Sequence, residues 1–283
     1  MSNNLIIGLA IGYPVERIQN FVLSLRQYYD GDVLFVIDSE NPDMLDFFNK
    51  NNIYSMILEE QINVGLIGFE RWEIYKEVIN EHFPDVERVL TSDVRDVVFQ
   101  GDPFDHFTDA ELEFSTEPMR IGECTIHNAK WIKDIYGDET LEEVKDNWIL
   151  CAGVVGGTKE GILKLCDLII EEGQRLKEIN KLTFTDQASL NVLYGQGKCP
   201  TGTLHLTGDD AMATMHHAKT LTFDRQGYLL SNNGNRIAMV HQYDRCGFSG
   251  LNFIKNALQV NGVSGMRFIA DYAAKNVPDH DLI

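Results

Sequence analysis

Short apolar runs alternate with segments of helical periodicity through the first hundred residues of the chain. Four of these runs predict strands: residues 5–10, 33–37, 53–58 and 89–92. Between them, apolar side chains recur every three or four positions, as at Trp72, Tyr75 and Ile79, which is typical of amphipathic helices. This strand–helix–strand repetition predicts an α/β fold with a mostly parallel sheet and helices on both faces.

The second half of the chain has a less regular pattern. It predicts a strand over residues 148–155, helices over 162–176 and 186–194, late strands over 228–230 and 237–240, and a helical tail from about residue 250. No linker, internal repeat or low-complexity stretch interrupts the sequence. We therefore expect a single domain over residues 1–283.

The composition is that of an ordinary globular protein. Hydrophobic residues make up 44% and charged residues 24% of the 283 residues, enough to build a core without disulfides. The five cysteines are odd in number and form no Cys-x-x-Cys pair, so we expect reduced, mostly buried thiols and no zinc site. No signal peptide or bilayer-spanning run is visible, which predicts a cytoplasmic protein without a transmembrane segment.

The net charge of −19 argues against binding to nucleic acid or to an anionic membrane. No dense run of Lys and Arg reverses this charge locally. A smaller anionic ligand would therefore need a divalent metal ion or well-placed arginines.

Ligands of parallel α/β sheets bind beyond the carboxyl ends of the strands. The polar residues at the predicted strand ends are Gly12 and Tyr13, residues 38–40, and residues 92–96. The last of these segments contains two acids, Asp93 and Asp96. Ionised carboxylates at the end of a buried strand need partners or a metal ion; alternatively, they cap a turn or pair with Arg95 and Arg88.

Residues 89–104, VLTSDVRDVVFQGDPF, resemble the acidic metal-binding motif of the GT-A superfamily of glycosyltransferases. The usual Asp-x-Asp is one residue longer here. Acids three positions apart point to opposite faces of a flat strand, so both reach one ion only if the backbone turns between them. The resemblance assigns Asp96 to the metal position, and Asp93 to the metal or to the ribose of the donor.

Two further segments resemble motifs of the glycogenin-like retaining transferases. In residues 150–157, Cys151, Ala152 and Gly153 match an Asn-Ala-Gly strand that lines the sugar pocket, with Cys in place of Asn. In residues 185–191, Asp186 and Gln187 match the Asp-Gln pair that contacts the transferred sugar or the acceptor. The structural alternatives are a glycine-interrupted core strand and a helix start capped by Thr185.

A late histidine after a strand is the third metal ligand in many GT-A enzymes, and His241 occupies that place. His216 and His217 compete with it, but they stand in no recognisable motif. Arg71 and Arg95 are candidate phosphate or sugar contacts. For Arg71 the alternative is a solvated charge on a helix.

The resemblance covers about residues 5–245 and implies a metal-dependent glycosyltransferase, with retention of configuration favoured over inversion. Its expected donor is a nucleotide-sugar, preferably a UDP-sugar, with the base and ribose near Gly12 and Tyr13. Oxygen-rich ligands with one histidine favour Mn²⁺, or else Mg²⁺. The acceptor is a glycan, a lipid-linked sugar or a protein.

The same resemblance divides the chain into a nucleotide-binding half (1–105), an acceptor and sugar half (106–245) and the tail (246–283). One alternative function is a nucleotide-sugar-binding module without catalysis. A second is a phosphatase of the haloacid dehalogenase type, which lacks support because no acid follows the first strand.

Overall fold

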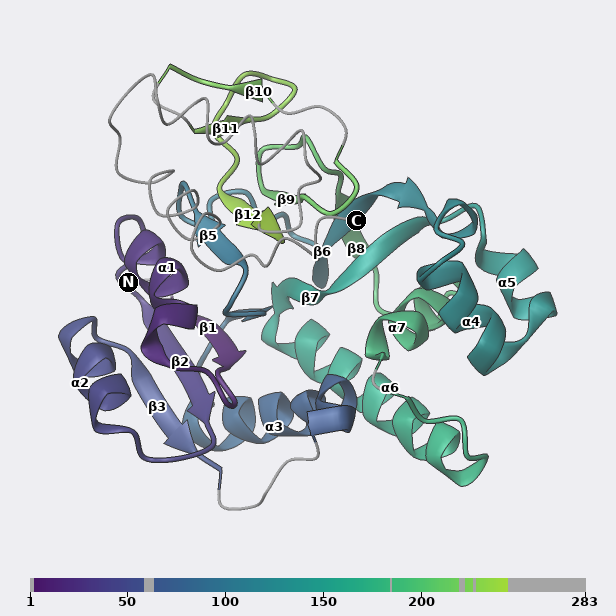
Figure 1. Ribbon diagram of the computed structural model, residues 1–283, viewed down its shortest axis with the longest axis horizontal. Helices are drawn as coiled ribbons and strands as arrows, with labels where there is room; N and C mark the ends of the chain where they lie inside the picture. The colour runs from purple at the N-terminus through teal and green to yellow at the C-terminus, as the bar shows by residue number, and fades with distance from the viewer. Residues whose placement is uncertain (1–2, 59–63, 184, 219–221, 226–227, 244–283) are drawn as a thin grey trace.

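The computed structural model describes residues 3–58, 64–183, 185–218, 222–225 and 228–243. Its main sheet has seven strands in the order β3-β2-β1-β4-β7-β6-β8 (Figure 1). The strands are β1 (Asn4–Leu9), β2 (Asp32–Ile37), β3 (Tyr54–Ile57), β4 (Arg88–Ser92), β6 (Leu112–Arg120), β7 (Trp148–Thr158) and β8 (Gly202–His205). Only β7 runs antiparallel to its neighbours β4 and β6. The predicted α/β class with a mostly parallel sheet is confirmed.

Seven α-helices lie among the described residues: α1 (Val15–Leu25), α2 (Pro42–Lys50), α3 (Ile67–His82), α4 (Asn128–Tyr136), α5 (Asp138–Val144), α6 (Lys159–Glu178) and α7 (Asp186–Gly195). Two short 3₁₀ helices, η1 (Val64–Leu66) and η2 (Ile121–Glu123), complete the helical elements. The start of α2 follows from its sequence, because the Asn41 side chain accepts hydrogen bonds from the backbone of Asp43 (3.0 Å) and Met44 (3.2 Å). None of the helices described is long and apolar enough to cross a bilayer.

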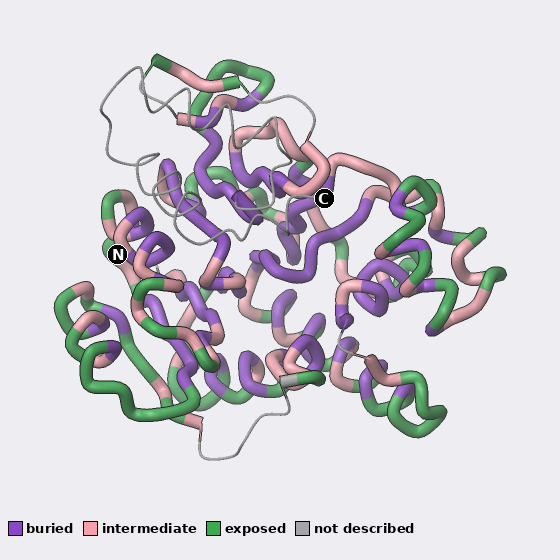
Figure 2. Tube along the Cα trace, viewed as in Figure 1, coloured by how far each residue is buried: buried purple, intermediate pink, exposed green. Residues whose placement is uncertain are grey.

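Alternate side chains of the buried strands enter two cores, one on each face of the sheet. Ile6 and Phe35 pack with Phe21 of α1 on one face, and α2 covers the same side. Their strand neighbours face the other way and pack with α3, α6 and α7. Figure 2 shows the buried strands between helices whose outer faces are exposed. Burial on both faces explains why these strands are continuous apolar runs in the sequence.

A second, smaller sheet joins distant parts of the chain. It has the order β5-β12-β9, formed by β5 (Val97–Phe99), β12 (Met239–His241) and β9 (Met212–Thr214). A two-stranded hairpin of β10 (Thr222–Phe223) and β11 (Leu229–Leu230) adjoins it in sequence. In the β5–β12 pair, His241 lies opposite Val97. This pairing carries the late histidine to the segment that follows β4.

Several elements were not predicted from the sequence. One of them is β6, which carries Glu113, Ser115 and Glu117, all buried, so it shows no apolar run. The Thr185 side chain precedes α7 but makes no capping hydrogen bond to it. The predicted helical tail lies outside the described residues.

Candidate metal and nucleotide site

The acidic segment turns sharply where β4 ends. The backbone bends through residues 93–96 before β5 begins at Val97, so Asp93 and Asp96 do not point to opposite faces of one strand. A ligand atom of each of these acids and one of His241 all lie within 4.8 Å of one another. The turn that the longer acidic spacing requires is therefore present.

His241 faces both carboxylates from the second sheet. Its Nε2 lies 3.5 Å from Asp93 Oδ2 and 3.7 Å from Asp96 Oδ1, yet this buried nitrogen makes no hydrogen bond to any described residue. The ring's other nitrogen, Nδ1, lies 3.4 Å from the sulfur of Cys151. The next residue, Gln242, has a φ of 55° and donates its backbone N–H to the Asp96 carbonyl at 2.7 Å. This bond fixes the histidine beside the acidic turn.

The charges around His241 favour a cation at this place. Burial by itself lowers the pKa of His241, but Cys151, Asp93 and Asp96 together raise it well above its usual value. The surroundings of His241 therefore favour a positively charged group. A divalent ion would satisfy the two carboxylates and the Nε2 lone pair together.

Gly153 on β7 makes room for this cluster. A Cβ at this position would lie 2.5 Å from Asp93 Oδ2 and 2.7 Å from His241 Cε1. The Gly153 carbonyl also accepts a 2.6 Å hydrogen bond from the Asp93 backbone. A glycine is thus needed here because a side chain would block two candidate metal ligands. The resemblance implied a different reason, the close approach of the donor to the backbone.

Arg71 is not a solvated helix charge, since its side chain is only 12% exposed. Its guanidinium donates to Asp93 Oδ1 at 3.1 Å, to Asp186 Oδ2 at 2.6 and 3.0 Å, and to the Ala152 carbonyl at 2.8 Å. Burial lowers the pKa of Arg71, but the carboxylates of Asp186 and Asp93 outweigh it and raise the pKa overall. Arg71 is therefore a buried, charged guanidinium that orients Asp93.

A cavity of about 160 Å³ opens beside the acidic turn. Five of the residues expected in the site line it, namely Tyr13, Arg71, Asp93, Arg95 and Asp96. Arg95 donates to Asp96 Oδ2 at 2.9 Å, which agrees with the expected alternative of an Arg95 ion pair. Arg88, by contrast, pairs with Asp109 at 3.9 Å. Burial raises the pKa of Tyr13, as do Asp93 and Asp96, whereas Arg95 lowers it.

The strand ends meet as expected for parallel strands. Gly12 has a φ of 69°, and its backbone N–H donates to Asp38 Oδ2 at 3.0 Å. This bond links the ends of β1 and β2 beside the cavity. Gly12 itself is exposed and does not line that cavity.

Asp186 and Gln187 lie behind the cluster, at the start of α7. The Asp186 side chain is 8% exposed, and its carboxylate also accepts a 2.7 Å hydrogen bond from the indole of Trp72. Gln187 accepts from the Ala152 backbone at 3.2 Å and donates to Glu117 at 2.8 Å and to Asn128 at 3.0 Å. In this arrangement Asp186 holds Arg71 in place, and Gln187 links β7 to β6 and α4.

Trp72, Glu117 and Asn128 were not singled out in the sequence. Trp72 was assigned to the core by its helical spacing, and only its indole N–H contact reveals the second role. Glu113, Ser115 and Glu117 are polar residues at every second position. This alternation is the sequence signal that could have indicated a strand with its polar side chains on one face.

The residues of the cluster suit an oxygen-preferring divalent ion. Two carboxylates and one imidazole, with positions left for a ligand's oxygens, match the preferences of Mn²⁺ and Mg²⁺. The described residues thus fit the metal that the sequence predicts. No family model matches this chain, and a search of curated proteins finds none with significant similarity.

Proposed function

We propose that this protein is a metal-dependent glycosyltransferase that uses a nucleotide-sugar, preferably a UDP-sugar, as donor. The observation that carries the proposal is the convergence of Asp93, Asp96 and His241 beside a cavity at the carboxyl end of β4. Ligands of open α/β sheets bind at this edge. The acceptor is a glycan or another sugar-bearing molecule.

The charge balance of the cavity supports a metal-bound diphosphate. Two positive residues, Arg71 and Arg95, and two negative residues, Asp93 and Asp96, line the cavity. Their charges cancel. A diphosphate entering a neutral pocket in a protein of net charge −19 needs an added cation. A divalent ion held by Asp93, Asp96 and His241 would neutralise the diphosphate and the charge that grows on it as the sugar leaves.

The surrounding residues have positioning roles in this proposal. Arg71 fixes Asp93, and Asp186 in turn fixes Arg71, so the Asp-Gln pair acts through the cluster as well as near the sugar. Tyr13 provides a half-buried ring at the cavity wall, suited to contact a base or ribose. When the ion binds Asp96, Arg95 can exchange its hydrogen bond with that carboxylate for one with a phosphate oxygen.

Thermal melting tests the donor site directly. Together, UDP and Mn²⁺ should raise the melting temperature more than either alone, because a ligand at a hundred times its Kd adds about 2.7 kcal/mol to stability. Slow hydrolysis of the matching UDP-sugar without acceptor should accompany binding. If UDP, GDP and a deoxythymidine nucleotide all leave the melt unchanged with Mn²⁺ present, the proposal fails. Binding without hydrolysis or transfer to any acceptor would instead indicate a nucleotide-sugar-binding module.

A further inference from the structure

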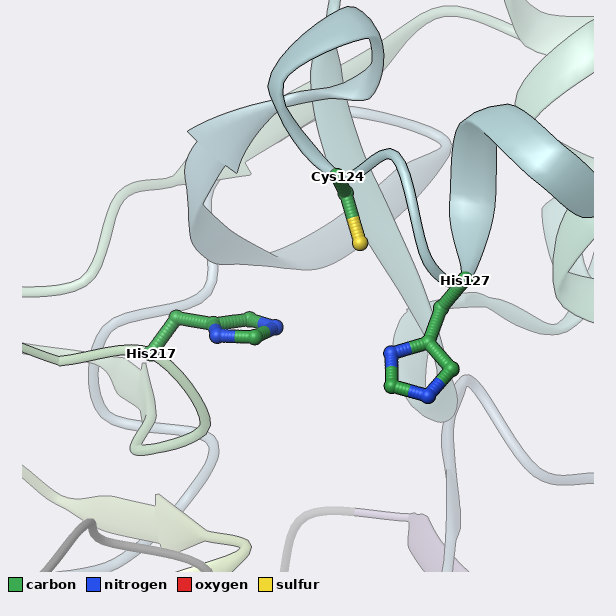
Figure 3. Close-up of side chains that lie close together, drawn as sticks. All are labelled: Cys124, His127 and His217. Carbon is green, nitrogen blue, oxygen red and sulfur yellow. The ribbon is translucent and has the colours of Figure 1, made fainter. Parts of the chain in front are cut away.

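A second group of metal-ligating side chains lies away from the acidic turn. Ligand atoms of Cys124, His127 and His217 lie within 4.8 Å of one another. In Figure 3 the thiol and the two imidazole rings point into the same space. None of these side chains takes part in the site proposed for the donor.

Two short segments supply the group. Cys124 directly follows η2 and His127 precedes α4, so a Cys-x-x-His segment supplies two ligands from one loop. His217 comes from the chain that leaves β9, three residues after Thr214. Its Nε2 is buried and has no hydrogen-bond partner among the described residues. A buried imidazole nitrogen in this position has an unmet need for a ligand.

Contrary to the expectation drawn from the cysteine spacing, we propose that Cys124, His127 and His217 bind a zinc ion. A thiolate with two imidazoles suits Zn²⁺, whereas Mg²⁺ and Mn²⁺ prefer oxygen ligands. In a tetrahedral site with bonds of about 2.0–2.3 Å, ligand atoms are about 3.5 Å apart. Small side-chain rotations would therefore close the group around the ion. Three protein ligands leave the fourth position to water.

The surroundings of the group match a bound cation. The side-chain amide of Asn128 donates a hydrogen bond to the Cys124 sulfur at 3.7 Å, which orients the thiol. The Glu117 side chain is buried, and its carboxylate lies 3.8 Å from Nδ1 of His216, the residue before His217. A zinc ion with one thiolate carries one net positive charge, which the Glu117 carboxylate would balance.

The zinc group also connects to the elements behind the donor site. Asn128, the first residue of α4, accepts a 3.0 Å hydrogen bond from Gln187 of α7. On the other side, Met215 donates its backbone N–H to the His241 carbonyl at 2.9 Å. The inference does not depend on glycosyl transfer, because it rests on a different set of ligands.

Cobalt substitution in the full chain tests the zinc site. One equivalent of Co²⁺ should give a thiolate-to-cobalt charge-transfer band that Zn²⁺ displaces. Cys124→Ser should abolish the band and weaken Zn²⁺ binding by more than about 100-fold, since even outer-shell changes cost 10–100-fold. His217→Gln should weaken Zn²⁺ to a similar degree, and it serves as the second variant if Cys124→Ser does not fold.

Three control variants locate the band. Cys199→Ser changes a thiol outside the group and should leave the band intact. Asp96→Asn removes a ligand of the acidic cluster, and Cys151→Ser removes the thiol beside His241; both should retain the band. Absence of any charge-transfer band, its survival in Cys124→Ser, or its loss in Cys151→Ser would overturn the proposal. A failure of UDP binding with an intact band would overturn the proposed function alone.

Discussion

The acidic cluster and the thiol–imidazole cluster differ in what holds their ligands. Asp93, Asp96 and His241 lie where two sheets meet, and Arg71, Arg95 and the β7 backbone fix them through several hydrogen bonds. The thiol–imidazole cluster of Cys124, His127 and His217 is carried by connections between elements. The first offers mainly oxygen and the second sulfur and nitrogen. The two clusters therefore favour different ions, because their ligand atoms differ. They also differ in how firmly their ligands are held before an ion binds, because several hydrogen bonds support the acidic cluster.

Replacing Asp96 should have the largest effect and should divide the two clusters. In Asp96→Ala, Mn²⁺-dependent binding of UDP should be abolished because the most buried carboxylate ligand is lost. The charge-transfer band of the thiol–imidazole cluster with Co²⁺ should remain. Isothermal titration with UDP and Mn²⁺ measures the loss, and Asp109→Asn, an exposed acid, is the control. Tight UDP binding in Asp96→Ala would remove this residue from the donor site.

Asp186→Asn should cost about 3 kcal/mol of unfolding free energy, because it breaks a buried ion pair with Arg71. Urea denaturation at neutral pH measures the change. The matched control is Asp167→Asn, which removes an exposed pair with Lys76 and should cost at most about 1 kcal/mol. Turnover should fall in Asp186→Asn as Arg71 and Asp93 lose their orientation. Equal stability losses in the two variants would contradict the positioning role of Asp186.

Gly153→Ala should destabilise the protein by about 1–3 kcal/mol through overpacking against Asp93 and His241. Its Mn²⁺ affinity should fall while Zn²⁺ affinity is unchanged, since the thiol–imidazole cluster makes no contact with this glycine. Gly101→Ala is the control, because its Cβ would meet Ala238 at an ordinary 3.4 Å. Unchanged melting and Mn²⁺ affinity in Gly153→Ala would show that the acidic cluster has room to spare.

Glu172 provides the smallest test, on a contact between α6 and the end of α4, the helix that His127 precedes. Its carboxylate accepts from Tyr136 at the end of α4 (2.8 Å) and from Arg175. Burial raises the pKa of Glu172, but these hydrogen bonds outweigh it and lower the pKa overall. A lowered folded-state pKa stabilises the protein above the unfolded value, about 4.3, and this contribution is lost as the pH falls through the folded value.

Glu172→Gln should therefore lower stability at pH 7 by a small amount and flatten its decline below about pH 4.3. Urea denaturation at several pH values measures this slope. Glu171→Gln, at the exposed neighbouring position, should keep the parent slope. An unchanged acid limb in Glu172→Gln would show that the Tyr136 and Arg175 contacts do not stabilise the ionised form.

The amino-acid sequence by itself determined the first half of the fold. Strands buried on both faces are usually apolar runs, so β1, β2 and β4 were visible in the sequence, and the helices between the strands followed from their periodicity. The order of these elements predicted that Gly12 and residues 92–96 lie at one sheet edge. The bond between Gly12 and Asp38 confirms that adjacent strand ends meet there.

Only the tertiary structure decided which distant residues share a site. The β5–β12 pairing brings His241 to Asp96, and the β9 connection brings His217 to Cys124; neither contact leaves a periodic signal in the chain. The buried acids of β6 are stable because partners from other elements, such as His205 on Glu113 at 2.7 Å, offset their desolvation. Local pattern encodes the burial of a segment, whereas a site depends on long-range pairing, which has no fixed spacing in sequence.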